Sequence, residues 1–300
     1  MDMKFRAHDT FFIRKGWISK GMRYVDKDGD VFISKKENPM DVLGIGANMV
    51  KALRYWLQAL CLTKEPPKGK RTQAFTEFGQ IVFDKDKYIE ELGTLYLLHY
   101  KLASNEALAT SWYYFFNLFS LSDFTRDEFA EQITNFIRME NPEITVAPRS
   151  IEDDFACIIN TYVPRYKTMP SKVSAENNID CPFGELGLVD ILKKEKNNVV
   201  YKKSIPQASS FNPRVILAVI HANAKGRKEI GLNELLTAKN NIGKIFNLDS
   251  ITMLDVLHTA ESTGELKIIR TAGLDVIHLA NEYSFEDCVK RYYEDIETGE

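Results

Sequence analysis

The sequence predicts a mainly α-helical protein with a minor β component (α+β), built from two mostly helical domains that each have winged helix-turn-helix character. Apolar residues recur at helical spacing over most of the chain. At two places a set of short helices is followed by a segment that resembles a two-stranded hairpin, which is the order of a winged helix. Because 300 residues are enough for two cores, we expect a boundary in the proline-containing segment 141–148, giving domains 1–145 and 146–300.

Charge is unevenly distributed along the chain. The formal net charge is only −3, but residues 1–75 carry 15 Lys and Arg against 8 Asp and Glu, while the other 225 residues carry 24 against 34. An electropositive N-terminal quarter on an acidic body fits a localised contact with phosphate groups. Chance unevenness is the alternative, and composition alone leaves both interpretations open.

The sequence contains no segment typical of a membrane or secreted protein. No apolar run is long enough to span a bilayer, and the first residues lack the apolar core and small-residue cleavage site of a signal peptide. We therefore expect a cytoplasmic protein without a membrane partner. Scattered cysteines without a CxxC pair predict buried, reduced thiols and neither a zinc ribbon nor a disulfide framework. The four are Cys61, Cys157, Cys181 and Cys288.

Residues 41–71 carry the clearest pattern of the N-terminal domain. A glycine turn at 44–46 precedes a helix expected over residues 47–62, with one apolar stripe and a polar, cationic face that includes Tyr55. The basic loop that follows has the position of a wing. If the helix enters the major groove and the loop contacts phosphate, the segment binds DNA; the alternative is a packed helical hairpin. The candidate DNA-binding residues are Asn48, Lys51, Arg54, Gln58, Lys64, Lys68, Lys70 and Arg71.

The remainder of the N-terminal domain is expected to be a helical bundle. A strand is expected over residues 73–79, a long helix over 81–101 and a helix over 124–139 that is capped by Thr125. The dense aromatics of residues 112–119 are interpreted as core, because they continue an apolar helix pair without interleaved bases. A helix over 150–162, with Ser150 as its cap, opens the C-terminal domain.

Residues 212–280 repeat the winged-helix order with a different charge. Helices are expected over 213–224, 232–248 and 250–264, and a hairpin over 265–280. The third of these helices is much less basic than its N-terminal counterpart, since Asp255 and Glu261 lie beside a single His258. We therefore expect this second module to contact protein rather than DNA.

Two further motifs resemble ion sites. Residues 26–37 place aspartates at calcium-loop spacing, but Val31 occupies the position that needs glycine, so a hairpin tip between strands is expected instead. His8-Asp9 resembles the metal-binding pair of hydrolases, but the other histidines are isolated in apolar segments. We predict no catalytic residue, metal site or cofactor.

Several separated motifs occur together in one order. They are His8-Asp9-Thr10-Phe11, Arg14, Gly16-Trp17, Leu43-Gly44-Ile45-Gly46, Arg54-Tyr55-Trp56, Phe75-Thr76-Glu77-Phe78-Gly79 and Cys181-Pro182-Phe183. In this order they resemble a prokaryotic family catalogued as domain of unknown function four-thousand-and-seven, over nearly the whole chain. The resemblance assigns no catalytic residues, so His8, Asp9, Arg14 and Trp17 are family-motif candidates of unknown role.

The resemblance also implies a genomic context. Members of the family are often encoded beside proteins similar to phosphoadenosine phosphosulfate reductase, in islands linked to DNA phosphorothioation and phage defence. The first hypothesis is accordingly a non-catalytic, double-stranded-DNA-binding accessory or regulatory component of such a system. The alternatives are an adaptor that docks a sulfurtransferase or nuclease partner through the acidic half, and a nuclease that uses His8 and Asp9. A homodimer is left open.

Overall fold

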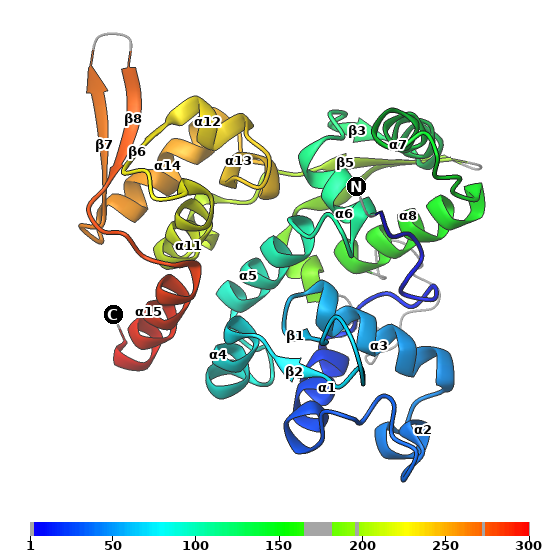
Figure 1. Cartoon of the computed structure of the whole chain (residues 1–300). Helices are drawn as coiled ribbons and strands as arrows, with labels where there is room; N and C mark the ends of the chain where they lie inside the picture. Colours follow the sequence, from blue (N-terminus) through cyan, green and yellow to red (C-terminus); the bar gives the residue numbers. More distant parts are fainter. Residues whose placement is uncertain (1–2, 165–181, 196–197, 272–273, 300) are drawn as a thin grey trace. The chain divides into compact units, whose positions relative to one another are not determined.

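The structure, a computed structural model of the whole chain, describes residues 3–164, 182–195, 198–271 and 274–299. The chain divides into two compact units, of which unit 1 contains residues 1–115 and 119–203 and unit 2 contains residues 116–118 and 204–300. Each is mostly helical with small antiparallel sheets (Figure 1). None of the described helices has the length and apolar character needed to cross a membrane.

Unit 1 is a set of helices with two small sheets. Its helices are α1 (Lys15–Lys27), α2 (Pro39–Leu43), α3 (Ala47–Ala59), α4 (Glu77–Asp86), α5 (Leu92–Ala103), α6 (Thr110–Asn117), which ends in unit 2, α7 (Arg126–Glu140), α8 (Pro148–Tyr162) and the 3₁₀ helix η2 (Pro182–Leu186). Strands β1 (Thr63–Lys64) and β2 (Ala74–Phe75) form a hairpin. Strands β3 (Asp123–Phe124), β4 (Val189–Lys194) and β5 (Val199–Lys203) form an antiparallel sheet in the order β3-β5-β4.

The boundary expected between residues 145 and 146 lies inside unit 1, between α7 and α8, which pack against each other. The capping box predicted for α7 is confirmed, because Thr125 and Glu128 bond each other's backbone N–H groups. Helix α8 begins earlier than expected. Pro148 occupies its first turn, where a missing N–H costs nothing, so Ser150 lies inside the helix and does not cap it.

The long helix expected over residues 81–101 is two helices. Helix α4 ends at Asp86, whose carboxylate accepts the backbone N–H groups of Glu90 at 2.8 Å and Glu91 at 3.0 Å. Ile89 adopts a φ of 57° in this turn and is completely buried. The side chain of Asp86 thus satisfies the backbone of a sharp turn that the apolar periodicity did not indicate.

Two strand predictions near α3 are also wrong. Residues 22–25 belong to α1, which ends at Lys27, so no hairpin surrounds the aspartates that follow. The strand expected over 73–79 is reduced to β2, because Thr76 caps α4 by accepting the N–H of Gly79 at 2.9 Å. In both cases helix formation, stabilised by tertiary packing, overrides the local β pattern.

The aromatic residues of 112–119 are core, as predicted. Trp112 and Phe115 are at most 1% exposed, and Phe119 packs edge-on against Phe124 with ring centroids 5.4 Å apart. Burying such rings contributes a large part of the apolar stabilisation of a core. Burial also raises the pKa of Tyr114 to about 12, so its hydroxyl stays protonated at physiological pH.

Unit 2 combines helices with one antiparallel sheet of order β6-β8-β7. Its elements are the 3₁₀ helix η3 (Ala208–Ser210), α11 (Pro213–Ala224), β6 (Glu229–Gly231), α12 (Leu232–Thr237), α13 (Ile242–Ile245), α14 (Ser250–Glu261), β7 (Leu266–Thr271), β8 (Leu274–Leu279) and α15 (Phe285–Thr298). The helix expected over 232–248 is split into α12 and α13. At the junction Gly243 lies so close to Leu236 that a Cβ would meet its carbonyl oxygen at 2.2 Å, so glycine is required.

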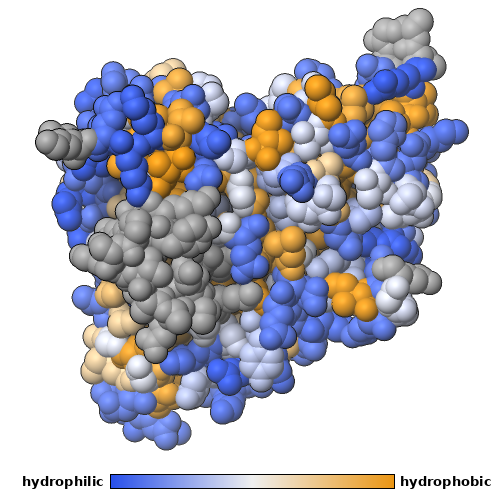
Figure 2. Space-filling view, turned by 180° about the vertical axis from the view of Figure 1, so that it is seen from behind, coloured by the Kyte–Doolittle hydropathy of each residue, from blue (hydrophilic) through white to orange (hydrophobic). Residues whose placement is uncertain are grey.

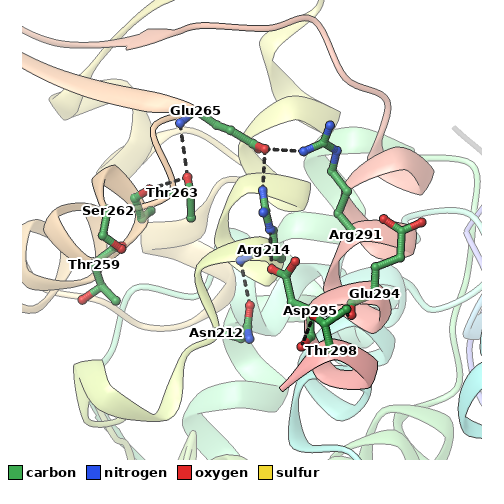
Figure 3. A network of polar contacts seen from close by, with 11 residues as sticks. Asn212, Arg214, Thr259, Ser262, Thr263, Glu265, Arg291, Glu294, Asp295 and Thr298 are labelled. Carbon is green, nitrogen blue, oxygen red and sulfur yellow. Dashed lines mark hydrogen bonds and ion pairs between the residues drawn. The ribbon is translucent and has the colours of Figure 1, made fainter. Parts of the chain in front are cut away.

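A network of polar contacts joins α15 to the rest of unit 2 (Figure 3). Arg214 donates its Nε–H to Asp295 at 2.6 Å, and both Arg214 and Arg291 donate to the same oxygen of Glu265, Arg291 at 2.6 Å. The Glu265 side chain is only 8% exposed, so it carries its charge beside two guanidinium groups. Helix α15 is thereby fixed by ion pairs as well as by its buried tyrosines, Tyr292 and Tyr293.

Candidate nucleic-acid interface

Two adjoining hollows open beside α3 in unit 1, with volumes of about 320 and 460 Å³. We call them together the α3 groove. The first is lined by Lys4, Ala7, Lys51, Arg54, Tyr55, Gln58, Glu65, Arg71 and Leu108. The second is lined by Lys4, Gln58, Cys61, Thr63, Lys64, Glu65, Pro66, Pro67, Arg71, Thr76, Asn105 and Leu108. Lining residues therefore come from α3, the N-terminal segment, the β1–β2 hairpin and the turn after α5.

Helix α3 supplies the polar floor of this groove. Its apolar stripe packs into unit 1, with Leu53, Trp56 and Leu57 at most 1% exposed. Tyr55, expected on the polar face, is instead buried and donates its hydroxyl to the carbonyl of Leu108 at 2.9 Å. Burial raises the pKa of Tyr55, and the nearby charge of Asp154 adds to this effect, so the phenol stays neutral.

Glu65 is the one carboxylate that lines the groove. Its side chain is 9% exposed, and it accepts the Nε–H of Arg54 at 2.6 Å and the amide of Gln58 at 3.0 Å. The amide of Gln73 bonds the same oxygen, while Arg71 lies 3.8 Å from the other. A carboxylate held by two guanidinium groups and two amides fixes the base of the hairpin against α3.

The loop between β1 and β2 is held at its far side by the segment after α1. Asp30 accepts the hydroxyl of Thr72 at 2.7 Å and pairs with Lys70. The backbone N–H of Gln73 donates to the carbonyl of Gly29 at 2.8 Å, and a Cβ at Gly29 would lie 2.4 Å from the Gln73 oxygen. Asp30, one of the aspartates at calcium-loop spacing, thus helps to position the basic loop.

Three lysines of the groove have no carboxylate partner among the described residues. Among the described residues, no carboxylate lies within ion-pair distance of Lys4, Lys51 or Lys64, and all three are exposed. The ammonium of Lys51 donates to the side-chain oxygen of Asn48 at 3.4 Å, and that of Lys4 lies 6.0 Å from the centre of the Tyr55 ring. The groove consequently offers positive charge to an anionic ligand, apart from the buried Glu65.

His8 is buried beneath the N-terminal segment that borders the groove. Its Nδ1 accepts the backbone N–H of Thr10 at 3.1 Å, which leaves the Nε2–H to donate to Asp154 at 2.7 Å. The other oxygen of Asp154 accepts the hydroxyl of Ser111 at 2.6 Å, and the imidazole stacks on Trp56. With both ring nitrogens bonded and the side chain 1% exposed, His8 fastens this segment to α8.

Arg14 and Trp17 also lie in a packed aromatic cluster. The Arg14 guanidinium lies 4.9 Å from the centre of the Trp17 ring and 5.4 Å from that of Phe12. Trp17 is 7% exposed, and the carbonyl of Phe11 accepts the indole N–H of Trp56 at 2.9 Å. These motif residues hold the N-terminal segment on α3.

The family described as "Protein of unknown function (DUF4007)" matches residues 5–293. The chain belongs to this family. The resemblance to a domain-of-unknown-function family is thereby confirmed. Two solved structures are similar: "Magnesium ion-bound SspB crystal structure", with a TM-score of 0.83, 26% identity and coverage of 98% of this chain and 89% of the other, and "SspB crystal structure", with a TM-score of 0.81, 26% identity and coverage of 98% and 87%. No curated protein matches the chain.

In this member of the DUF4007 family, five of the eight candidate DNA-binding residues meet in one place. Lys51, Arg54, Gln58, Lys64 and Arg71 line the groove, whereas Asn48, Lys68 and Lys70 do not. The sequence interpretation missed Lys4, Glu65 and Leu108. Lys4 and Leu108 lie far from α3 in sequence, so no local pattern could have indicated them. Glu65 lies within the basic loop, but its sequence position does not show that Arg54 and Gln58 bind it.

A magnesium ion is named for one of the two similar structures. Mg²⁺ takes oxygen ligands in octahedral geometry, usually from carboxylates and water. Within the described ranges no group of three His, Cys, Asp or Glu side chains is placed to hold a metal ion. The adjacent Asp153 and Asp154 bond Arg6, His8 and Ser111. Because their carboxylates are already bonded in this way, these two residues do not fit a magnesium site.

Proposed function

We propose that this protein is a non-catalytic DNA-binding accessory or regulatory component of a prokaryotic DNA modification system of the phosphorothioation type, or of an anti-phage defence system. One observation carries the DNA-binding part: cationic residues from α3, the hairpin and the N-terminal segment converge on a single groove with three uncompensated lysines. When such lysines neutralise DNA phosphates, counterions are released from the DNA, and this release favours binding. The modification setting rests on the family resemblance.

Winged-helix character in both units is part of this proposal. In unit 1, α3 followed by the β1–β2 hairpin supplies a helix and a wing. In unit 2, the order α11, β6, α12, α13, α14, β7, β8 with a sheet of order β6-β8-β7 supports a winged helix in which α14 would be the recognition helix.

DNA binding is tested by fluorescence anisotropy over a salt range of about 50–200 mM, where phosphate contacts change affinity most visibly. We expect binding that weakens with salt and is lost on combined Lys51→Glu and Arg54→Glu substitution. Lys36→Glu, on an exposed stretch outside the groove, is the matched control. Undiminished binding by the double variant would refute the assignment.

A second candidate, docking of a sulfurtransferase-like protein or another defence subunit through unit 2, is favoured by α14. This helix contains no Lys or Arg, and it leaves Ile251 71% exposed beside the exposed Asp255. On the face drawn in Figure 2, outside the grey atoms, apolar side chains form separate patches on a mostly hydrophilic surface. Co-purification with the product of an adjacent gene that is abolished by Ile251→Asp would support docking.

A further inference from the structure

The shape of the α3 groove bears on which form of DNA it accepts. An α-helix reads a duplex by projecting into a major groove about 12 Å wide, which is close to the diameter of the helix itself. Seven of the thirteen residues of α3 are buried, so only a narrow polar strip remains. That strip lies between Lys4 and Ala7 on the N-terminal segment, Leu108, and the hairpin residues. Within this strip Lys51, Arg54 and Gln58 line a hollow that other segments also border, and such a hollow favours a ligand small enough to enter it over an intact duplex.

The dimensions of the groove suit single nucleotides better than a duplex. Its hollows of about 320 and 460 Å³ are in the range of pockets that enclose small ligands, about 300–1,000 Å³. The second has apolar walls at Pro66, Pro67 and Leu108, on which the flat face of a base can pack. Polar groups for a base edge stand at the floor, where Gln58 is held by two donated hydrogen bonds, to Arg54 and to Glu65.

The phosphates of the DNA backbone have binding groups of their own, at the edge of the groove. Lys51 borders the first hollow, Lys64 borders the second, and Lys4 borders both. All three are exposed, whereas the carboxylate of Glu65 is buried below them. Anionic groups are therefore attracted to the rim, and a neutral base that can both donate and accept hydrogen bonds fits the floor.

We propose that the α3 groove binds unpaired nucleotides of DNA, with bases in the hollows and phosphates on Lys4, Lys51 and Lys64, and that it does not read an intact major groove. This inference rests on the proposed DNA-binding function and specifies its substrate. A single strand and bases extruded from a duplex share the required chemistry. Neighbouring hollows with common walls accept successive nucleotides of one strand.

The test compares three labelled oligonucleotides of the same sequence: a single strand, its perfect duplex, and a duplex with a central unpaired segment. We expect the single strand to bind at least about tenfold more tightly than the duplex, as for other proteins that pack bases on a platform. If the natural ligand is a base extruded from a duplex, the interrupted duplex should bind as tightly as the single strand. If it is a free single strand, the interrupted duplex should bind more weakly than the single strand. Equal or tighter binding of the perfect duplex would overturn the inference.

Filling the groove provides a second test that leaves its charges intact. Leu108→Trp, or Ala7→Phe should the first variant fold poorly, is expected to lower single-strand affinity to the duplex level while duplex affinity stays unchanged. Leu192→Trp, at a half-exposed leucine of β4, is the matched control. Equal loss for both substrates, or no loss, would overturn the inference.

The outcomes separate the two proposals. Absence of binding to any of the three DNAs would refute both the function and the substrate. Salt-sensitive duplex binding that depends on Lys51 and Arg54, without preference for unpaired DNA, would refute only the substrate.

Discussion

The Nε–H of Arg54 on α3 donates to Glu65 on the hairpin at 2.6 Å, and both side chains line the same groove. This pair joins the two elements that the proposed function requires. It also places a negative charge in the groove, and this charge opposes the binding of an anionic ligand by electrostatic repulsion.

Replacing Glu65 by glutamine removes this negative charge while keeping the size of the side chain. We expect DNA affinity to rise by about threefold to tenfold, since a partly exposed charge interaction contributes about 1 kcal/mol. The same variant should be slightly less stable, because Arg54 loses its ion pair. Anisotropy titration and thermal unfolding measure the two effects; weaker DNA binding at unchanged stability would show that Glu65 itself contacts the ligand.

Lys4 and Lys64 border the groove from the N-terminal segment and from the hairpin. Replacing either by alanine should weaken binding to all DNA sequences alike and reduce the slope of log K against log salt by about 1, because each lysine neutralises one phosphate. Lys36→Ala serves as the control with an unchanged slope. A change in sequence preference without a change in slope would argue against a phosphate contact.

His8→Ala should act on stability rather than on chemistry. It removes the buried donor to Asp154 and leaves that carboxylate bonded only to Ser111 and to the backbone of Arg6. We expect the free energy of unfolding of unit 1 to fall by about 3 kcal/mol, from the lost charged hydrogen bond and the cavity. Denaturant titration measures the change, and an unaltered midpoint would contradict the structural role.

Gly79 in α4 lies against the backbone of Leu62, in the segment between α3 and β1. A Cβ on it would come within 1.8 Å of the Leu62 carbonyl oxygen, so Gly79→Ala forces the helix away and should cost about 3 kcal/mol or more. Gly16, in α1, has nothing within 4 Å of the same position, and Gly16→Ala should leave stability unchanged or raise it by up to about 1 kcal/mol. Circular dichroism melts of the two variants compare them directly.

Unit 2 should lose stability in mild acid through His221. Burial lowers the pKa of this histidine below its usual 6.5, although the charge of Glu265 opposes the shift, and its Nε2 has no partner among the described residues. Between the two pKa values the unfolded chain binds the proton and the folded chain does not, so stability is full above pH 6.5 and falls as pH decreases.

The pH dependence is measured by thermal melts from neutral pH to about pH 5, a range in which an unperturbed histidine titrates. In the His221→Gln variant, the melting temperature should fall less steeply with decreasing pH than in the parent chain. A variant with the same pH profile as the parent chain would exclude His221 as its origin. His258, which is exposed on α14, provides the matched substitution in the same unit.

Local chemistry in the sequence determined a substantial part of this protein. The apolar spacing of α3, the capping box of α7 and the helical and hairpin order of residues 212–280 were all readable, because each depends on neighbours within a few positions. The polar strip of Lys51, Arg54 and Gln58 on α3 followed from the same periodicity.

Only the tertiary structure decided what these elements enclose. Helix α4 ends in a turn bonded by the carboxylate of Asp86, and Gly243 in α13 allows a close backbone approach to Leu236 in α12; neither feature alters apolar periodicity. Lys4 and Leu108 reach the groove because distant segments pack around α3, and Glu65 becomes buried because Arg54 and Gln58 meet it there. Helix formation is a local equilibrium, whereas a groove depends on contacts between residues far apart in the chain, so its shape and its charge balance emerge only after folding.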